Sequence, residues 1–197
     1  MRFFLLFLFG ALTLTVFDAF HTLSGTTAYA GAYHASRLEW WTPVLMGAGT
    51  AIGGSIYAGV YRVLGAPKDP PPWSVIASSL WCFGALYFFS GFYHGSNVTK
   101  LVVLSVSGVA AFWWLDRTWQ GAVCTLILTV AGPLVEIGLV RAGTFVHLQP
   151  DVLGIPMWLP ALYFCAGSVI GHGSRRILMT SALGRNDTQS MTSPALP

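Results

Sequence analysis

Six long apolar segments occupy most of this 197-residue chain and decide what it can fold into. They cover about residues 3–20, 41–63, 74–94, 100–115, 119–140 and 157–178. An α-helix needs about 20 mostly apolar residues to cross the hydrocarbon core of a membrane. The pattern therefore predicts an all-α integral membrane protein, folded as a bundle of six transmembrane helices.

The composition supports this prediction. Hydrophobic residues make up 54% of the chain and charged residues only 9%, whereas a soluble domain carries about 25% charged residues. So few charges cannot cover a surface that faces water. The net charge of +3 is too small and too scattered for a nucleic-acid-binding surface, so we expect no nucleic-acid partner.

The chain divides into one membrane domain, residues 1–180, and a short tail. Residues 181–197 are mostly polar, and we expect this tail to be flexible. The first apolar segment could instead be a signal peptide, because Ala28-Tyr29-Ala30 has the small-x-small form of a cleavage site. That triplet lies too far beyond the apolar run, so we interpret the segment as a span.

The lysines and arginines predict the orientation, because cytoplasmic loops carry more of them. With the N-terminus inside, the inner segments hold Arg2, Arg62, Lys68, Arg117, Arg175, Arg176 and Arg185, and the outer segments hold Arg37, Lys100 and Arg141. We therefore expect both termini in the cytoplasm. Every tryptophan except Trp81 lies at the end of a predicted span, where interfacial anchors belong.

Glycines four residues apart occur in or beside three predicted spans. The pairs are Gly49 with Gly53, Gly91 with Gly95, and Gly167 with Gly171. Such pairs let helix backbones approach closely in a membrane. The favoured interpretation is packing within the chain. The alternative is that small residues leave room for a lipid tail or for a second subunit, as in a homodimer or homotrimer.

Ionisable residues inside spans are costly and are therefore candidates for function. Glu136 lies one turn after Pro133, which should kink the fifth span and free a backbone carbonyl. One hypothesis is thus an ion or small-molecule transporter that uses Glu136. The favoured interpretation is a satisfied polar residue near the outer interface, within reach of water or Arg141.

The remaining polar residues do not form a recognisable catalytic motif. His21, His34, His94 and His147 map to the outer side, but no pair has the spacing or the carboxylate framing of a zinc protease. Asp18 and His21 are three residues apart and share a helix face. Cys82, Cys124 and Cys165 lie inside apolar segments and are expected to be packing residues. We expect no metal, no cofactor and no enzymatic activity.

Four blocks of residues, in order, resemble the insulin-induced gene (Insig) family of six-span membrane proteins. They cover about residues 38–180 and coincide with the span ends. The blocks are WWTPVLMGAG with Tyr57, Arg62 and LGAP; FSGFYHGS around Phe89, Gly91, His94 and Ser96; FWWLDR with Trp113, Trp114, Asp116 and Arg117; and WLPALYFCAGSVIGHGSRRILM from Trp158 to Met179.

The resemblance implies a regulator rather than an enzyme. Eukaryotic family members bind an oxysterol within the membrane and contact the sterol-sensing spans of partner proteins in the endoplasmic reticulum, a role in cholesterol homeostasis. Sterol contact in the family involves spans 3 and 4, and the aspartate that matches Asp116 is associated with partner binding. The short entry into the first span and the short loop between spans 3 and 4 resemble a compact, prokaryotic member. Its location would then be the plasma membrane rather than the endoplasmic reticulum.

We therefore predict a protein that binds a sterol or a diacylglycerol-type lipid in a cleft among its helices and signals through contacts with membrane proteins. The predicted lipid-binding residues are Phe89, Gly91, His94, Thr99, Gly53 and Trp113, and the predicted partner-binding residue is Asp116. Candidate hydroxyls for the lipid are Thr50, Ser55, Ser78, Ser79 and Ser90. Each hydroxyl could instead bond to a carbonyl of its own helix.

Overall fold

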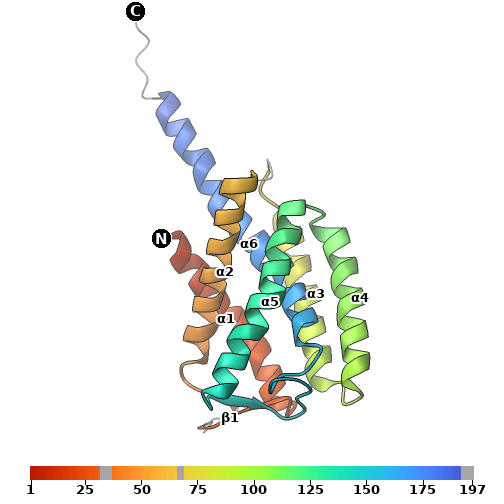
Figure 1. Ribbon diagram of the computed structural model, residues 1–197. Coiled ribbons are helices and arrows are strands. Elements are labelled where there is room, and N and C mark those ends of the chain that lie inside the picture. Colours follow the sequence, from red (N-terminus) through yellow and green to blue (C-terminus); the bar gives the residue numbers. More distant parts are fainter. Residues whose placement is uncertain (32–36, 66–68, 192–197) are drawn as a thin grey trace, which may run out of the picture.

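Six helices and one short antiparallel ribbon make up the described part of the chain in the computed structural model (Figure 1). The structure describes residues 1–31, 37–65 and 69–191, with side chains as far as Ile177. The elements are α1 (Arg2–Leu23), β1 (Thr27–Tyr29), α2 (Thr42–Leu64), α3 (Trp73–Phe92), α4 (Asn97–Leu115), α5 (Trp119–Arg141), β2 (Phe145–His147) and α6 (Leu159–Met191). His34, predicted on the outer side, and Lys68, predicted on the inner side, lie outside the described residues, as does the side chain of Arg185.

Each predicted span corresponds to one helix. Five of them, α1 to α5, are long and apolar enough to cross a membrane. Their outward faces carry exposed apolar side chains, for example Leu12, Ile52, Val106 and Val130, as expected where lipid is the solvent. The sixth helix is less apolar, and it continues to Met191. It therefore extends through residues 181–191 of the predicted tail.

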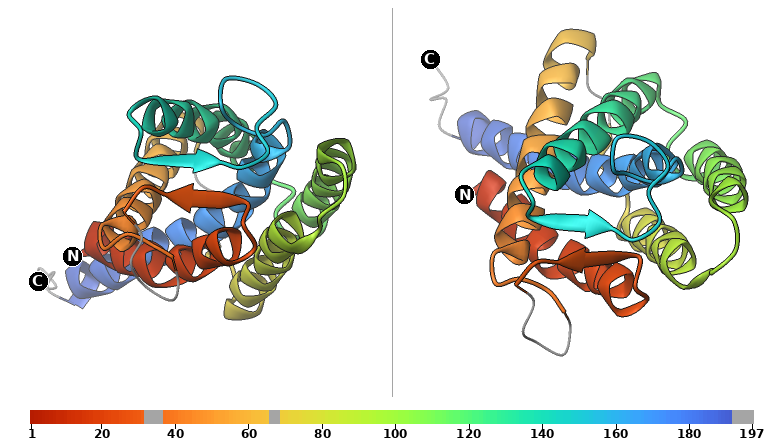
Figure 2. Two further views of the ribbon diagram at one scale, coloured as in Figure 1. Left: turned by 90° about the horizontal axis from the view of Figure 1, so that it is seen from below. Right: turned by 60° about the horizontal axis from the view of Figure 1, so that its bottom comes forward.

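Helix α6 runs through the middle of the bundle (Figure 2). It contacts each of the other five helices, and almost every side chain from Leu159 to Arg175 is buried or nearly so. A helix that is shielded on all sides does not need an apolar surface. This position explains why α6 can carry Ser168, His172, Ser174 and Arg175, all of them buried.

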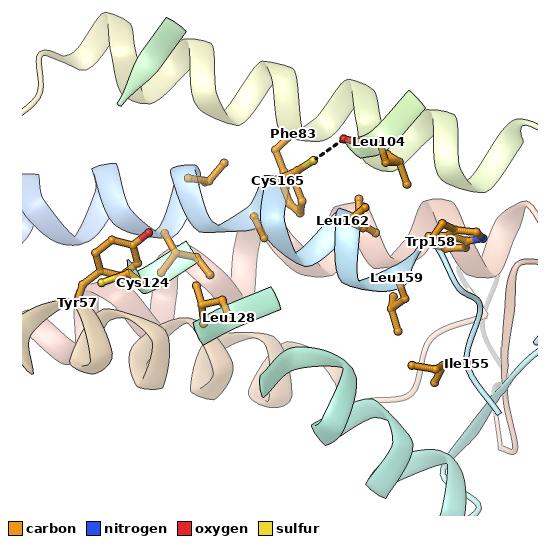
Figure 3. Close-up of a cluster of buried hydrophobic side chains, with 14 of the residues drawn as sticks. Tyr57, Phe83, Leu104, Cys124, Leu128, Ile155, Trp158, Leu159, Leu162 and Cys165 are labelled. Atoms are coloured by element: carbon orange, nitrogen blue, oxygen red, sulfur yellow. Dashed lines mark hydrogen bonds between the residues drawn. The ribbon is translucent and has the colours of Figure 1, made fainter. Parts of the chain in front are cut away.

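The core lies on both sides of α6 (Figure 3). Leu162 and Cys165 of α6 face Phe83 of α3 and Leu104 of α4, and the Cys165 thiol donates to the Leu104 carbonyl at 3.6 Å. On the other side of α6 the core includes Tyr57, Cys124 and Leu128 from α2 and α5, and the Tyr57 hydroxyl donates to the Gly167 carbonyl at 2.6 Å. Packing contacts and interhelical hydrogen bonds of this kind hold membrane helices together.

The two ends of the bundle differ. At one end, called the strand end, β1 pairs with β2 with Thr27 opposite His147. The opposite end holds the N-terminus, the C-terminal part of α6 and the α4–α5 turn, and is called the termini end (Figure 1). The strands were not predicted, because three residues are too short to leave a period in the sequence.

Most of the glycines spaced four residues apart lie at close contacts between helices. A Cβ on Gly167 would lie 2.4 Å from the Thr125 hydroxyl, and one on Gly171 would lie 2.6 Å from the Tyr57 ring. Gly53 faces Ile170, and Gly91 faces the end of α1. Packing within the chain is thus confirmed for these four. Gly49 has open space where a Cβ would be.

Candidate functional site

Two of the predicted lipid-binding residues, Gly91 and His94, lie together at the strand end. They line a cavity of about 20 Å³ with Lys100, His147 and Trp158 among the other lining residues. A water molecule needs roughly 10–15 Å³ of such space. The cavity therefore has room for a small polar group and is too small for a sterol ring system or an acyl chain.

The other four predicted residues are dispersed. Phe89 stacks on Tyr93 with ring centroids 5.0 Å apart, and the backbone N–H of Thr99 donates to the Ser96 side chain, which caps α4. Gly53 lies within the contact between α2, α5 and α6. Trp113 is exposed near the termini end of α4. The six residues do not form one site, and their role in lipid binding stays a prediction.

A larger hollow lies between α3 and α4, in the half of the bundle nearer the termini end. It has a volume of about 330 Å³ and is lined by Ala77, Ser78, Trp81, Cys82 and Trp114. We call it the α3–α4 groove. The Trp81 side chain is 79% exposed although it lies in the middle of a helix that can span the membrane. The groove therefore opens toward the lipid.

Ser78 supplies the free polar group of this groove. The hydroxyls of Thr50, Ser55, Ser79 and Ser90 all donate to carbonyls of their own helices, as the local interpretation expected. Ser78 makes no hydrogen bond through its hydroxyl within the part of the chain that the structure describes. Its hydroxyl is thus available to a ligand in the groove.

Glu136 belongs to a polar cluster at the strand end that satisfies its carboxylate. Its carboxylate accepts hydrogen bonds from His147 Nε2 at 2.8 Å and from the Tyr163 hydroxyl at 2.7 Å. Nearby, Asp18 accepts from the Tyr29 hydroxyl at 2.8 Å. Burial and the adjacent Asp18 carboxylate raise the pKa of Tyr29 above its ordinary value, so this phenol remains a donor. Glu136 is the satisfied polar residue expected, with His147 and Tyr163 as partners in place of Arg141.

A second polar cluster lies at the termini end around Asp116. Its side chain is 1% exposed and lies 3.6 Å from Arg175 and 3.8 Å from His172 Nε2. His172 Nδ1 is in turn 2.6 Å from the Ser79 hydroxyl. The cluster links the α4–α5 turn, α6 and α3. The start of the fifth span could also have held an exposed acid stabilised by the helix dipole, but the Asp116 carboxylate is buried against His172 and Arg175 of α6.

The histidines do not come together as ligands. In the described ranges, no group of three or more His, Cys, Asp or Glu residues could hold a metal ion. His21 bonds to Ser90 and stacks on Tyr87, while His147 is bound to Glu136.

Sequence reasoning predicted Ser78 as a candidate hydroxyl, but it missed His172 and the other residues of the groove, which are Ala77, Trp81, Cys82 and Trp114. No neighbouring residue in the sequence indicates a role for His172, because its partners Asp116 and Ser79 are far away along the chain. Trp81 did carry a signal, as the one tryptophan away from a predicted span end. Trp113, the neighbour of Trp114 in the FWWLDR block, is the predicted lipid contact, but Trp114 is the one that lines the groove.

Known proteins resemble this chain over most of its length. The chain is 31% identical over 171 residues to an INSIG protein homolog of Mycolicibacterium vanbaalenii, a match that covers 83% of this chain and 80% of that protein. It is 27% identical to insulin-induced gene 1 protein of Gallus gallus (88% of this chain, 71% of that protein) and 27% identical to insulin-induced gene 2 protein of Xenopus laevis (91% and 84%). No protein-family model matches it.

Solved structures give the same relationship. The crystal structure of MvINS, a mycobacterial Insig homolog from Mycobacterium vanbaalenii, aligns with a TM-score of 0.80 and 25% identity over 90% of this chain and 94% of that one. A cross-linked trimer of MvINS aligns with a TM-score of 0.79. Sequence identity and helix arrangement agree over nearly the whole chain, and the chain belongs to the Insig family of multi-pass integral membrane proteins.

Proposed function

We propose that this protein is a non-catalytic Insig-like regulator that binds a neutral lipid, a sterol or a diacylglycerol, in the α3–α4 groove. It responds to the lipid by changing its contacts with other proteins in the bilayer. The observation that carries the proposal is the free Ser78 hydroxyl on a groove walled by Trp81 and Trp114.

The groove suits a lipid with one or two hydroxyls. Its volume of about 330 Å³ is at the lower end of the range of roughly 300–1,000 Å³ for small-molecule sites. The indoles of Trp81 and Trp114 offer flat apolar walls, and small side chains at Ala77 and Cys82 leave the space between them. A hydroxyl-bearing lipid would pair with Ser78 and leave its remaining surface in the bilayer. The family's use of spans 3 and 4 supports this placement.

The proposed topology has six spans with both termini in the cytoplasm, in the plasma membrane of a prokaryote. Helix α6 is the sixth span, surrounded by the other five. A cytoplasmic location of the termini end is supported by the arginines there, because cytoplasmic segments are rich in them. These arginines are Arg2, Arg62, Arg117, Arg175 and Arg176.

The protein acts as a homo-oligomer in this proposal. A cross-linked trimer is known for MvINS, and α2 presents an open face at Gly49 and Gly59, which permits close approach of another helix. Asp116 contributes to partner contacts without touching the partner, because its buried pairing with Arg175 and His172 holds the α4–α5 turn against α6.

Lipid binding is tested on protein purified in a neutral maltoside detergent. Mass spectrometry of the retained lipid identifies its class, and titration with dioleoylglycerol and with cholesterol gives the affinities. Trp81→Ala should weaken binding at least tenfold, whereas Trp40→Ala, which removes an indole that is equally exposed at 79%, should leave it within twofold. Ser78→Ala should weaken binding about fivefold, and Ser55→Ala should not.

The proposal fails if neither lipid binds, or if Trp40→Ala weakens binding as much as Trp81→Ala. In the second case the tryptophans act as interfacial anchors only, and the groove is not the site.

A further inference from the structure

Lys100 is a buried cation without a counter-ion. It lies in the first turn of α4 at the strand end and is only 4% exposed. Its ammonium lies 5.3 Å from the centroid of the Trp158 ring. In the part of the chain that the structure describes, no carboxylate or other acceptor lies within bonding distance of this ammonium. An unpaired buried ammonium is costly, and contact with an indole face offsets only part of that cost.

The nearby carboxylates are already engaged elsewhere. Asp151 accepts hydrogen bonds from Asn97 Nδ2 and from the Met157 N–H, each at 2.8 Å. Glu136 is held by His147 and Tyr163. Asn97 also accepts from Trp158 Nε1 at 3.0 Å, which fixes the indole against Lys100. The surroundings thus position the ammonium and leave its charge uncompensated.

Lys100 lines the small cavity at the strand end, and the other charged and polar features there favour an anion. His94, His147 and the hydroxyl-bearing Ser24 and Thr26 are also on the cavity wall. The first turn of α4 adds the positive end of a helix dipole. No acidic side chain is among the residues that line the cavity.

We infer that this cavity is a binding site for a carboxylate group, with Lys100 as its counter-ion. The volume of about 20 Å³ matches a carboxylate head and is too small for a phosphodiester with its glycerol. The carboxylate belongs either to a single-chain fatty acid, with its tail in the bilayer, or to a small acid from the aqueous phase. The site is distinct from the α3–α4 groove and does not depend on the function proposed for it.

Binding of palmitate labelled with ¹³C at the carboxyl carbon tests the site. The protein is kept in maltoside or in phosphatidylcholine nanodiscs, because anionic detergents would compete. We expect saturable binding and a shifted carboxyl resonance. Lys100→Met should weaken binding at least tenfold, while Lys100→Arg should stay within about threefold. The matched control is Arg141→Met, which removes an exposed cation at the same end and should stay within twofold.

Methyl palmitate has the same tail without the charge and should not compete. Competition by acetate identifies the source of the carboxylate. If millimolar acetate displaces palmitate, the site is open to water and takes small acids; if it does not, the ligand is a membrane fatty acid. Both outcomes support a carboxylate site. Equal binding by wild type and Lys100→Met, or equal competition by methyl palmitate, overturns the inference.

The two proposals fail independently. Trp81→Ala should leave palmitate binding unchanged, and Lys100→Met should leave cholesterol or dioleoylglycerol binding unchanged. A cooperative unfolding transition, followed by tryptophan fluorescence, confirms separately that Lys100→Met is folded.

Discussion

At the residue scale, Asp116 and Arg175 hold opposite charges where almost no water reaches. The carboxylate is 1% exposed, and the guanidinium lies 3.6 Å away while also donating to the Asp69 carbonyl at 3.0 Å. Removal of one partner from a buried pair leaves the other charge unpaired, which is more costly than removal of both.

We therefore predict that Asp116→Ala lowers the free energy of unfolding by about 3 kcal/mol. The double variant Asp116→Ala with Arg175→Met should recover a large part of that loss, because no uncompensated cation remains. The measurement is a double-mutant cycle in mixed micelles, with unfolding followed by tryptophan fluorescence. Effects that simply add, to within about 0.5 kcal/mol, would show that the pair is not coupled.

The hydroxyl-bearing residues show which residue-scale features could be predicted. Thr50, Ser55 and Ser90 bond to their own helices because a carbonyl one turn earlier is always within reach. The pairing of His172 with Ser79 and Asp116 could not be predicted, because it joins residues that only the packed bundle brings together.

At the element scale, α2 contains two glycines in different environments. A Cβ on Gly47 would lie 2.8 Å from both the Phe7 ring and the Phe7 carbonyl of α1, whereas a Cβ on Gly49 would meet nothing within 4 Å. The backbones of α1 and α2 are therefore in close contact at Gly47. A backbone cannot move away from an added methyl group as a flexible side chain can.

Gly47→Ala should lower the free energy of unfolding by about 1–3 kcal/mol through this overpacking. Gly49→Ala, two residues away in the same helix, should leave stability unchanged or raise it by at most about 1 kcal/mol, because alanine favours helix. Both are measured by the same unfolding assay. Equal effects would place the α1–α2 contact elsewhere than at Gly47.

Helix positions were predictable from the sequence, but their partners were not. The first five apolar segments match α1 to α5 to within a few residues, since each span must satisfy its own backbone hydrogen bonds, whereas α6 continues to Met191, well beyond the predicted end of the sixth segment. The α3–α4 groove depends on how two helices diverge, and the Lys100 cavity depends on the chain between α5 and α6 returning over the strand end. Neither leaves a periodic pattern in the sequence.

At the scale of the whole molecule, the arrangement is five apolar helices around a more polar sixth. The outer helices face lipid and must be apolar. The polar groups of α6 instead contact the surrounding helices: His172 contacts Ser79 and Asp116, and the Gly167 carbonyl accepts a hydrogen bond from Tyr57. Hydropathy measures the cost of exposure to lipid, so it underestimates a helix that lipid does not reach. The same shielding keeps the Asp116–Arg175 pair inside the bundle.

The number of spans can be tested through the two termini. With six spans both termini lie on one side of the membrane, and with five they lie on opposite sides. Epitope tags at Met1 and Pro197 should therefore respond alike to protease in sealed vesicles of known orientation. A third tag at the exposed turn around Leu153, between α5 and α6, should respond in the opposite way. If the C-terminal tag instead behaves like the tag at Leu153, α6 does not cross the membrane. A helix that is buried by five neighbours would then have to enter and leave the bundle at the same end. That outcome is at odds with its contacts, which extend from Trp158 at the strand end to Arg175 beside Asp116 at the termini end.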